Sequence, residues 1–169
     1  MADVEHLPFA DGSIDLVYAT GLFEHVADER TVIREIARVL KPGGIAHVEV
    51  PFLEQYHEDP IDCRRLTVPG LEMCMARERF ETLAKGAHIG PTVALLNMRA
   101  RWWALVFEGE SKIAKAASFG VFALLSTLQW PLRHLDHFLI RKRRAHTLAA
   151  GVYYTGRKPS EAAAGGRAP

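Results

Sequence analysis

The sequence predicts an α/β domain in which the strands of a parallel sheet alternate with helices. Residues 14–50 contain a strand, an amphipathic helix and a second strand with short joins, and such a βαβ unit nearly always crosses over right-handed into a parallel sheet. The composition agrees, because 49% of the 169 residues are hydrophobic and 24% are charged, as in a domain with enough apolar side chains for a core. Disordered, collagen-like and coiled-coil chains are excluded by the same composition.

The first strand is predicted at Ile14–Ala19. This run is short, β-branched and aromatic, and the turn residues Asp11-Gly12-Ser13 precede it, as expected of a buried strand.

A helix is predicted over Asp28–Leu40, because its apolar residues recur at helical spacing and most of its charged residues lie on the other side. Asp28 is a suitable N-cap. Lys41-Pro42-Gly43-Gly44 then supplies a cation near the helix end, a proline that cannot continue the helix and glycines for a left-handed exit. The second strand follows at Ile45–Val50 and is closed by Pro51.

Beyond this unit the pattern predicts a polar loop, four helices and two further strands. In chain order these are the loop Glu54–Thr67, a helix at 69–79, a strand at 80–89 that Lys85 and Gly86 weaken, helices at 92–107, 112–130 and 132–140, and a last strand at 148–155. We therefore expect one domain over 1–159, with a helical insert at about 92–144. The tail 160–169, rich in Ala and Gly, is expected to be disordered.

Charge and cysteine usage exclude several classes of protein. The formal charge of +1 provides no field for holding DNA or RNA. Cys63 and Cys74 are too few for a disulfide framework, and no Cys/His group has zinc-type spacing, so no metal site is predicted. The polar, acidic start Met1–His6 is unlike a signal peptide, and we expect a cytoplasmic protein.

Three motifs follow one another within residues 3–44. They are Leu7-Pro8-Phe9 running into Asp11–Val17, then Glu24-His25-Val26, and then Arg34–Gly44, which ends in Lys-Pro-Gly-Gly. In this order and spacing they resemble the class I S-adenosylmethionine-dependent methyltransferases of the type 11 group. The resemblance implies a Rossmann-like, doubly wound sheet, of which this chain is the C-terminal part, with S-adenosylmethionine outside the carboxyl ends of the strands.

The resemblance also implies the residues that hold the cofactor. An acidic residue and the following backbone N–H contact the adenine in this family, and Asp3 and Val4 match those positions. A loop at the end of the first visible strand passes beside the methionine part of the cofactor, and Thr20, Gly21 and Leu22 match it, with Gly21 allowing close backbone approach. Glu24 and His25 open toward the same cleft, and we assign His25 to the cofactor site. The alternative for His25 is a packed histidine that pins the following helix.

One part of the family pattern is missing. Such enzymes begin with a strand, a Gly-x-Gly-x-Gly loop and a helix, and none of these precedes Asp3 here. We therefore expect a chain truncated at the N-terminus, with an unpaired edge on the strand Ile14–Ala19. The alternative function is a non-catalytic methyltransferase-like remnant that acts as an interaction or membrane-surface module.

The loop Pro51–Thr67 resembles the loop after the fifth strand in methyltransferases found beside glycan biosynthesis enzymes. His57, Asp59, Asp62 and Arg65 match that pattern, whereas Cys63 and Leu66 replace its usual aromatics. We assign His57 and Asp59 to deprotonation of an acceptor hydroxyl, and Asp62 and Arg65 to binding of a small-molecule or glycan acceptor. The alternative for Asp62 and Arg65 is an ion pair that pins the following helix.

The segment Ala116–Leu128 carries no charge, but it is shorter than the roughly 20 apolar residues that cross a bilayer. We expect one of two arrangements. The segment is a core helix that covers the sheet or a homodimer interface, or it is an apolar flap that rests on a membrane. The membrane contact would be made by 116–144 at the inner face of an anionic membrane. It is favoured by an aromatic and a basic group near the apolar run, namely Trp130, Arg133 and Arg141–Arg144. The basic run also fits a helix C-terminus followed by a solvated loop.

Overall fold

A computed structural model describes residues 3–57 and 61–160 of this chain. The chain divides into two compact units, which are described separately. The sheet unit comprises Met1–Phe52, His57–Gly86 and Val152–Pro169, and the helical unit comprises Leu53–Tyr56 and Ala87–Gly151. The predicted tail lies outside the described residues except for Ser160.

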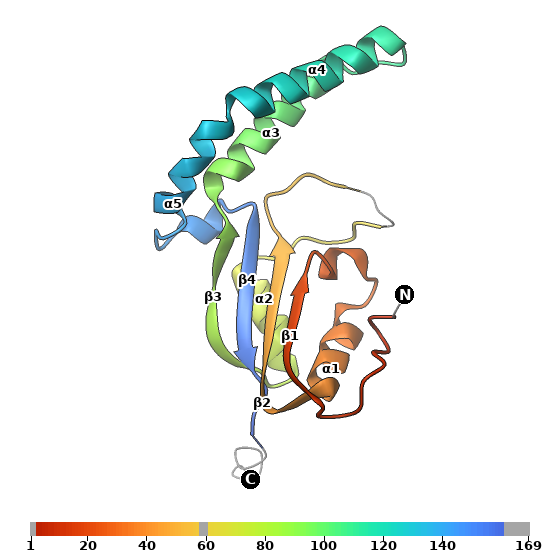
Figure 1. The fold of residues 1–169 in the computed structure, drawn as a ribbon, viewed down its shortest axis with the longest axis vertical. Helices are drawn as coiled ribbons and strands as arrows, with labels where there is room; N and C mark the ends of the chain where they lie inside the picture. Colours follow the sequence, from red (N-terminus) through yellow and green to blue (C-terminus); the bar gives the residue numbers. More distant parts are fainter. Residues whose placement is uncertain (1–2, 58–60, 161–169) are drawn as a thin grey trace. The chain divides into compact units, whose positions relative to one another are not determined.

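Within residues 3–57 and 61–160 the sheet has four strands, one for each strand that the sequence predicts, and their order is β1-β2-β4-β3 (Figure 1). Their bounds are β1 Ile14–Thr20, β2 Leu40–Pro51, β3 Glu81–Ile89 and β4 Gly151–Arg157. The strands β1 and β2 are parallel, with Tyr18 opposite His47, as the βαβ prediction requires. The strand β4 runs in the opposite direction. The α/β fold class is thereby confirmed.

The second strand begins earlier than predicted. β2 starts at Leu40, directly after the helix, and its pairing with β1 shifts register between Ile14 and Leu16. The expected left-handed glycine is present at Gly43, whose φ is +81°. The segment is also held against the end of β4, because Gly43 N donates to Lys158 O at 2.9 Å and Lys158 N donates to Gly44 O at 2.8 Å. Satisfying these backbone groups extends the strand through the glycines.

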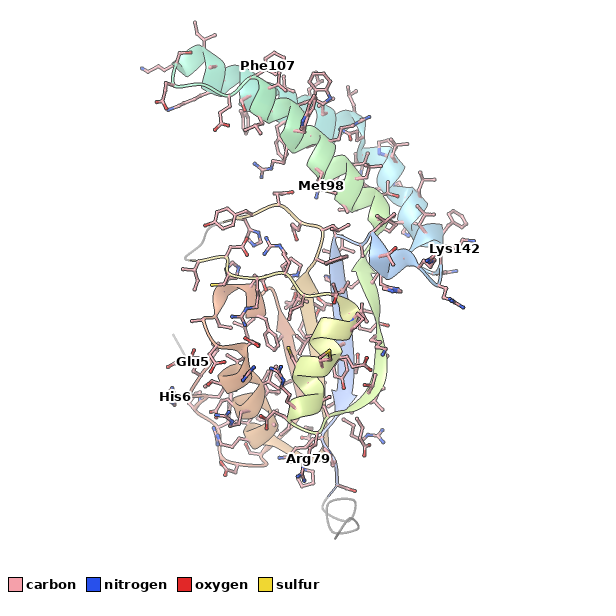
Figure 2. The ribbon with its side chains drawn as sticks, turned by 180° about the vertical axis from the view of Figure 1, so that it is seen from behind. Glu5, His6, Arg79, Met98, Phe107 and Lys142 are labelled. Carbon is pink, nitrogen blue, oxygen red and sulfur yellow. The ribbon has the colours of Figure 1, made fainter. Side chains whose placement is uncertain are left out.

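Two helices cover one face of this sheet (Figures 1 and 2). α1 spans Glu29–Val39, and Asp28 caps it by accepting from Arg30 N at 3.0 Å, as predicted. α2 spans Val68–Arg77 and is capped by Thr67. The core of the unit is formed by fully or almost fully buried apolar side chains: Val32, Ile33, Ile36 and Val39 of α1, Ala46, Val48 and Val50 of β2, and Leu71 and Met75 of α2.

The opposite face of the sheet carries exposed side chains. Leu16 and Tyr18 of β1 are each 58% exposed. Tyr18, His47 and Tyr153 stack across neighbouring strands, with ring centroids 5.1 and 5.5 Å apart. β1 is the edge strand of the sheet within the described part of the chain, as expected. Such an edge offers unpaired backbone groups to another strand.

The helical unit contains the helices of the predicted insert. They are α3 Pro91–Val106, α4 Lys112–Leu128 and α5 Asp136–Leu139, with 3-10 turns η2 Trp130–Leu135 and η3 Ala145–Thr147. The buried carboxylate of Asp136 caps α3 by accepting from Thr92 N at 2.9 Å and Val93 N at 3.0 Å. This cap fixes the start of α3 from a residue more than 40 positions away in sequence.

Apolar side chains project outward along α3 and α4 (Figure 2). No residue of α4 is buried, and Ile113 and Phe119 are 83% and 73% exposed. α4 is therefore not a core helix of the described chain, because its apolar residues lie all around the helix while only part of its surface packs on α3. The homodimer interface stays a prediction.

Among the described residues, no single helix is long and apolar enough to cross a membrane. α4 and Trp130–Leu139 pass that test only as a pair, which is bent by 47°.

Candidate active site at the carboxyl ends of β1 and β2

The site begins where β1 leaves the sheet. Thr20 ends the strand, Gly21 N donates to Glu49 O of β2 at 3.3 Å, and Leu22 leads into the 3-10 turn η1, Phe23–His25. Phe23 is fully buried and anchors this turn in the core. The turn therefore presents its next two side chains beyond the carboxyl ends of two parallel strands, where doubly wound sheets bind ligands.

Gly21 is required by its backbone conformation. Its φ of +57° is unfavourable for residues with a side chain. A Cβ added there would lie 3.5 Å from Glu24 Oε1, which is an ordinary contact. The left-handed turn, rather than crowding within this chain, accounts for the glycine.

Glu24 is the functional candidate to which sequence reasoning gave no role. Its side chain is only 3% exposed, and its Oε2 atom is buried without a hydrogen-bond partner among the described residues. Its other carboxylate oxygen lies 3.9 Å from His25 Nε2. A buried carboxylate with so few partners is costly, and such a cost is typical of a site that binds something. The Glu24-His25 dipeptide at the exit of a predicted strand was the available signal.

The segment after β2 folds back onto η1. Cys63 N donates to Glu24 O at 2.8 Å, and the His25 Nδ1 atom is hydrogen-bonded to Ile61 O. Arg64 continues the contact by donating to Ala27 O at 2.7 Å. These bonds join residues that are more than 30 positions apart in sequence, and they hold the His25 ring in place. His25 is thus held by the loop after β2 rather than by the helix that follows it, and its assignment to the cofactor site stays a prediction.

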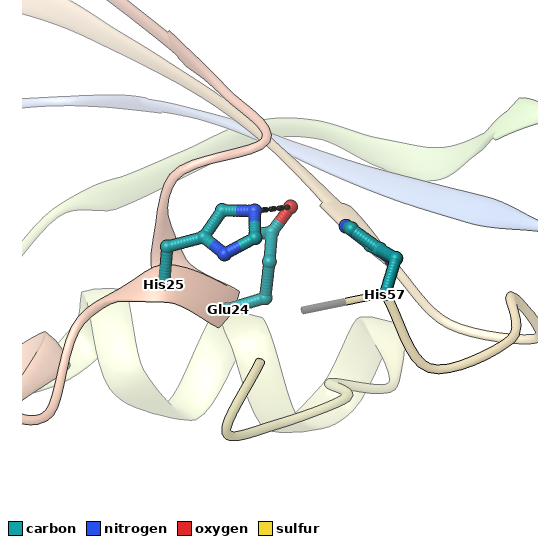
Figure 3. Close-up of side chains that lie close together, drawn as sticks. All are labelled: Glu24, His25 and His57. Atoms are coloured by element: carbon teal, nitrogen blue, oxygen red, sulfur yellow. Dashed lines mark ion pairs between the residues drawn. The ribbon is translucent and has the colours of Figure 1, made fainter. Parts of the chain in front are cut away.

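His57 completes the cluster (Figure 3). Its ring centroid lies 5.3 Å from that of His25, with the planes at 75°. A carboxylate oxygen of Glu24 and one ring nitrogen of each histidine all lie within 4.8 Å of one another. We call Glu24, His25 and His57 the polar cluster.

Asp62 and Arg65 form a partly buried ion pair, in which the Asp62 side chain is fully covered. Arg65 Nη2 donates to Asp62 Oδ2 at 2.6 Å, Arg65 Nη1 bonds Asp62 Oδ1, and His57 N donates to Asp62 Oδ2 at 2.8 Å. The Arg65 guanidinium, and then the His57 N–H, hold the pKa of Asp62 well below its usual range. Asp62 also lies 3.5 Å from His57 Nδ1. The ion pair of the alternative is thus present, and it orients His57; acceptor binding by the pair stays a prediction. Asp59 lies outside the described residues.

Asp3 lies in a local turn of its own. Its exposed carboxylate accepts from Glu5 N at 2.9 Å and pairs with His6 Nδ1 at 3.1 Å. These bonds, the backbone one first, lower the pKa of Asp3. Val4 is half-buried. The described hydrogen bonds of Asp3 are confined to residues 3–6, so the adenine assignment of Asp3 and Val4 stays a prediction.

The segment that follows Asp3 is fastened to α1. Glu35 Oε1 accepts from Leu7 N at 2.7 Å, and Arg38 donates to Leu7 O at 3.1 Å and to Phe9 O at 2.9 Å. Arg38 also holds the pKa of Glu35 at about 2, mainly by hydrogen bonding. The motif Leu7-Pro8-Phe9 is thus bound to the helix of the Arg34–Gly44 motif.

The helical unit has a groove of its own, with a volume of about 620 Å³. Its walls combine the apolar surfaces of Met98, Trp102 and Leu105 with the charged side chains of Arg101 and Glu108.

The first part of the chain matches a known family. The family described as "Methyltransferase domain" matches residues 1–48, a range that includes Glu24 and His25 and ends before His57. Methyltransferase GfsG of Streptomyces halstedii is 50% identical over 44 residues, which are 26% of this chain and 16% of that protein.

Solved structures share the fold over almost the whole chain. The [4+2]-cyclase SpnF has a TM-score of 0.53 at 22% identity and covers 94% of this chain and 54% of its own. Phosphoethanolamine N-methyltransferase 2 of Haemonchus contortus, solved with S-adenosyl-L-methionine, has a TM-score of 0.52 at 17% identity and covers 94% of this chain and 36% of its own. This chain therefore spans about half or less of the length of these three proteins. Residues 1–48 are thus similar to the methyltransferase domain family, and the chain shares its fold with solved proteins that include an S-adenosyl-L-methionine-bound methyltransferase.

Proposed function

We propose that this chain takes part in methyl transfer from S-adenosylmethionine to a hydroxyl group of a small molecule or glycan precursor. The observation that carries the proposal is the polar cluster beyond the carboxyl ends of β1 and β2. A hydroxyl must lose its proton as it accepts a methyl group, and carboxylate and imidazole groups are the side chains that handle such protons. The cluster lies at the end of the sheet where this fold binds its ligands.

Two features of the described residues support binding of the cofactor. The exposed Asp3 carboxylate can accept a further hydrogen bond from an amino group, because each of its oxygens has more than one lone pair. The left-handed turn at Gly21 leaves no Cβ beside the cluster. S-adenosylmethionine, when bound, supplies an activated methyl group, so the chain's own residues have to orient the acceptor and handle its proton.

His57 is the proposed proton acceptor. Asp62 Oδ2 lies 3.5 Å from His57 Nδ1 and accepts from the His57 backbone N–H at 2.8 Å. A carboxylate on Nδ1 favours the tautomer that carries its lone pair on Nε2 and stabilises the imidazolium that forms. The ion pair of Asp62 with Arg65 keeps this carboxylate charged and in place.

We further propose that the helical unit binds a membrane surface. Supporting this are the exposed apolar side chains of α4 and the nearby basic run Arg141–Arg144. Asp136 is the one acidic residue of 116–144, and it is used as the cap of α3. An apolar surface next to cations suits an anionic bilayer, which is where a lipid-linked glycan precursor would be found.

The first test is binding of S-adenosylhomocysteine to this chain by isothermal titration calorimetry, after circular dichroism has shown that the chain is folded. We expect micromolar binding and an affinity about tenfold weaker for Asp3→Ala, because a hydrogen bond to the adenine is lost. Glu5→Ala is the matched control, since the Glu5 contribution to this turn comes from its backbone N–H. A folded chain without binding would favour the non-catalytic remnant.

The second test concerns His57. If it accepts the proton, His57→Ala lowers methyl transfer to a hydroxyl acceptor and leaves S-adenosylhomocysteine affinity unchanged. His146→Ala changes a histidine of the helical unit and is the matched control. Equal turnover of the His57 variant would contradict its assignment.

A further inference from the structure

The polar cluster has the composition of a metal site. Two imidazoles and one carboxylate form a donor set that suits divalent transition metals such as zinc. The residues come from two segments of the sheet unit, η1 and the chain after β2. Their candidate ligand atoms lie within 4.8 Å of one another. In the sequence these residues lack any spacing typical of zinc sites, so only the fold brings them together.

The hydrogen bonds of the two imidazoles orient them as ligands. A carbonyl oxygen can only accept, so His25 Nδ1 is the donor to Ile61 O and the neutral ring has its lone pair on Nε2. His57 Nδ1 lies 3.5 Å from Asp62 Oδ2, which favours the same tautomer. Histidines that bind metals usually donate their other N–H to a carbonyl or carboxylate in this way.

Glu24 provides the independent observation. Its carboxylate is 3% exposed and its Oε2 atom is buried without a partner among the described residues. Its Oε1 atom lies 3.9 Å from His25 Nε2, which is too long for a hydrogen bond. In the neutral tautomer two hydrogen-bond acceptors face each other across this gap, and a cation between them would satisfy both.

We infer that Glu24, His25 and His57 bind a divalent cation of the zinc class. Tetrahedral ligands at zinc bond lengths lie about 3.4 Å apart, and the candidate ligand atoms lie within 4.8 Å of one another, so cation binding requires the cluster to contract by up to about 1.4 Å. Three protein ligands leave a position open for water or substrate, as in catalytic zinc sites. A cation also neutralises the buried Glu24 carboxylate.

The catalytic use of this cation rests on the proposed function. Glu24 Oε1 lies 3.5 Å from the position of a Cβ on Gly21, so the cluster borders the turn assigned to the methionine part of the cofactor. A cation there lowers the pKa of a hydroxyl that reaches its open position. The hydroxyl proton leaves to solvent, the oxygen–carbon bond forms as the carbon–sulfur bond breaks, and the sulfonium becomes a neutral thioether. With the cation bound, the Nε2 lone pair of His57 serves as a ligand, so the cation replaces His57 in the role of proton acceptor proposed above and solvent takes the proton; His57 accepts the proton only in the cation-free site.

The test is titration of the chelator-treated full chain with Co²⁺, followed by its visible absorption, and competition with Zn²⁺. We expect one equivalent of Co²⁺ to bind per chain. The affinity for Co²⁺ should fall about a hundredfold or more in each of the variants Glu24→Gln, His25→Gln and His57→Gln, because even residues that only contact a metal ligand contribute 10- to about 100-fold. His137→Gln is the control, because the His134–His137 ring pair, 5.6 Å apart, is the competing imidazole pair. Its affinity should equal that of the unchanged chain.

Thermal unfolding with and without Zn²⁺ separates loss of binding from loss of folding. The unchanged chain and His137→Gln should melt at a higher temperature with Zn²⁺, whereas the three cluster variants should fold but show no shift. Absence of stoichiometric binding, or binding that the cluster variants retain, would overturn the inference and leave an ion pair between His25 and Glu24. Titration of S-adenosylhomocysteine with a chelator present tests the proposed function separately, because the adenine and methionine contacts do not use the cation.

Discussion

Replacing Asp136 by Ala should destabilise the helical unit by about 2–4 kcal/mol. The Asp136 carboxylate accepts from Thr92 N and Val93 N at 2.9 and 3.0 Å, and it is 9% exposed. Loss of an N-cap costs about 0.5–2 kcal/mol, and each buried donor left without a partner adds about 1–3 kcal/mol. These terms overlap, because the same two N–H groups are counted in both, and the sum is reduced accordingly.

Tryptophan fluorescence measures this unit alone. The three tryptophans, Trp102, Trp103 and Trp130, all lie in the helical unit. We expect Asp136→Ala to lower the urea midpoint of the fluorescence transition by roughly 1–2 M, given about 1–3 kcal/mol per M for a unit of this size. Asp136→Asn keeps one acceptor oxygen and should lose less than half as much.

Gly90 provides an internal check on this cap. A Cβ on Gly90 would lie 2.2 Å from Asp136 Cγ, so Gly90→Ala should displace the Asp136 carboxylate. In the double variant with Asp136→Ala the two losses should therefore be far from additive. An unchanged midpoint in Asp136→Ala, or strict additivity in the double variant, would refute the role of Asp136.

The remaining predictions concern acid stability, the turn after β1 and the membrane. The Arg38 contact lowers the pKa of Glu35 from 4.5 to about 2, so the Glu35–Arg38 contact stabilises the fold fully above about pH 4.5 and loses this effect as the pH falls toward 2. Glu35→Gln should therefore flatten the dependence of Tm on pH between these values. An unchanged slope would contradict this prediction. Gly21→Ala should destabilise the sheet unit by about 1 kcal/mol in urea unfolding followed by circular dichroism, and Gly21→Asn by less, because Asn tolerates positive φ. Phe119→Ser should reduce co-sedimentation of the chain with vesicles of phosphatidylcholine and phosphatidylserine. Phe9→Ser changes an exposed phenylalanine of the sheet unit and should not reduce it. Equal sedimentation of both variants would argue against the membrane contact.

Local patterns were sufficient for most of the fold. The alternation of strand and helix over 14–50 and the N-cap at Asp28 depend on neighbours within a few residues, and the structure has both. The start of β2 at Leu40 was not predictable, because it depends on hydrogen bonds of Gly43 and Gly44 to Lys158, which lies at the far end of the chain.

The exposure of α4 was not predictable from the sequence either. The sequence shows a charge-free run at 116–128, and such a run fits a buried helix as well as an exposed one. Which of these occurs depends on what packs against the helix. The structure leaves every α4 residue at least partly exposed, and this finding favours the membrane proposal over a core helix.

The sequence by itself determined the α/β class, the order of the strands along the chain and the resemblance to class I methyltransferases, because motif order and periodicity are properties of neighbouring residues. Only the tertiary structure decided which side chains meet. His57 follows β2 and joins Glu24 and His25 because parallel strands end at the same edge of a sheet. Asp62 binds Arg65 and orients His57, and burial leaves the Glu24 carboxylate in need of a partner. Burial and proximity across more than 30 residues are not encoded in local spacing, which is why the polar cluster emerged only from the fold.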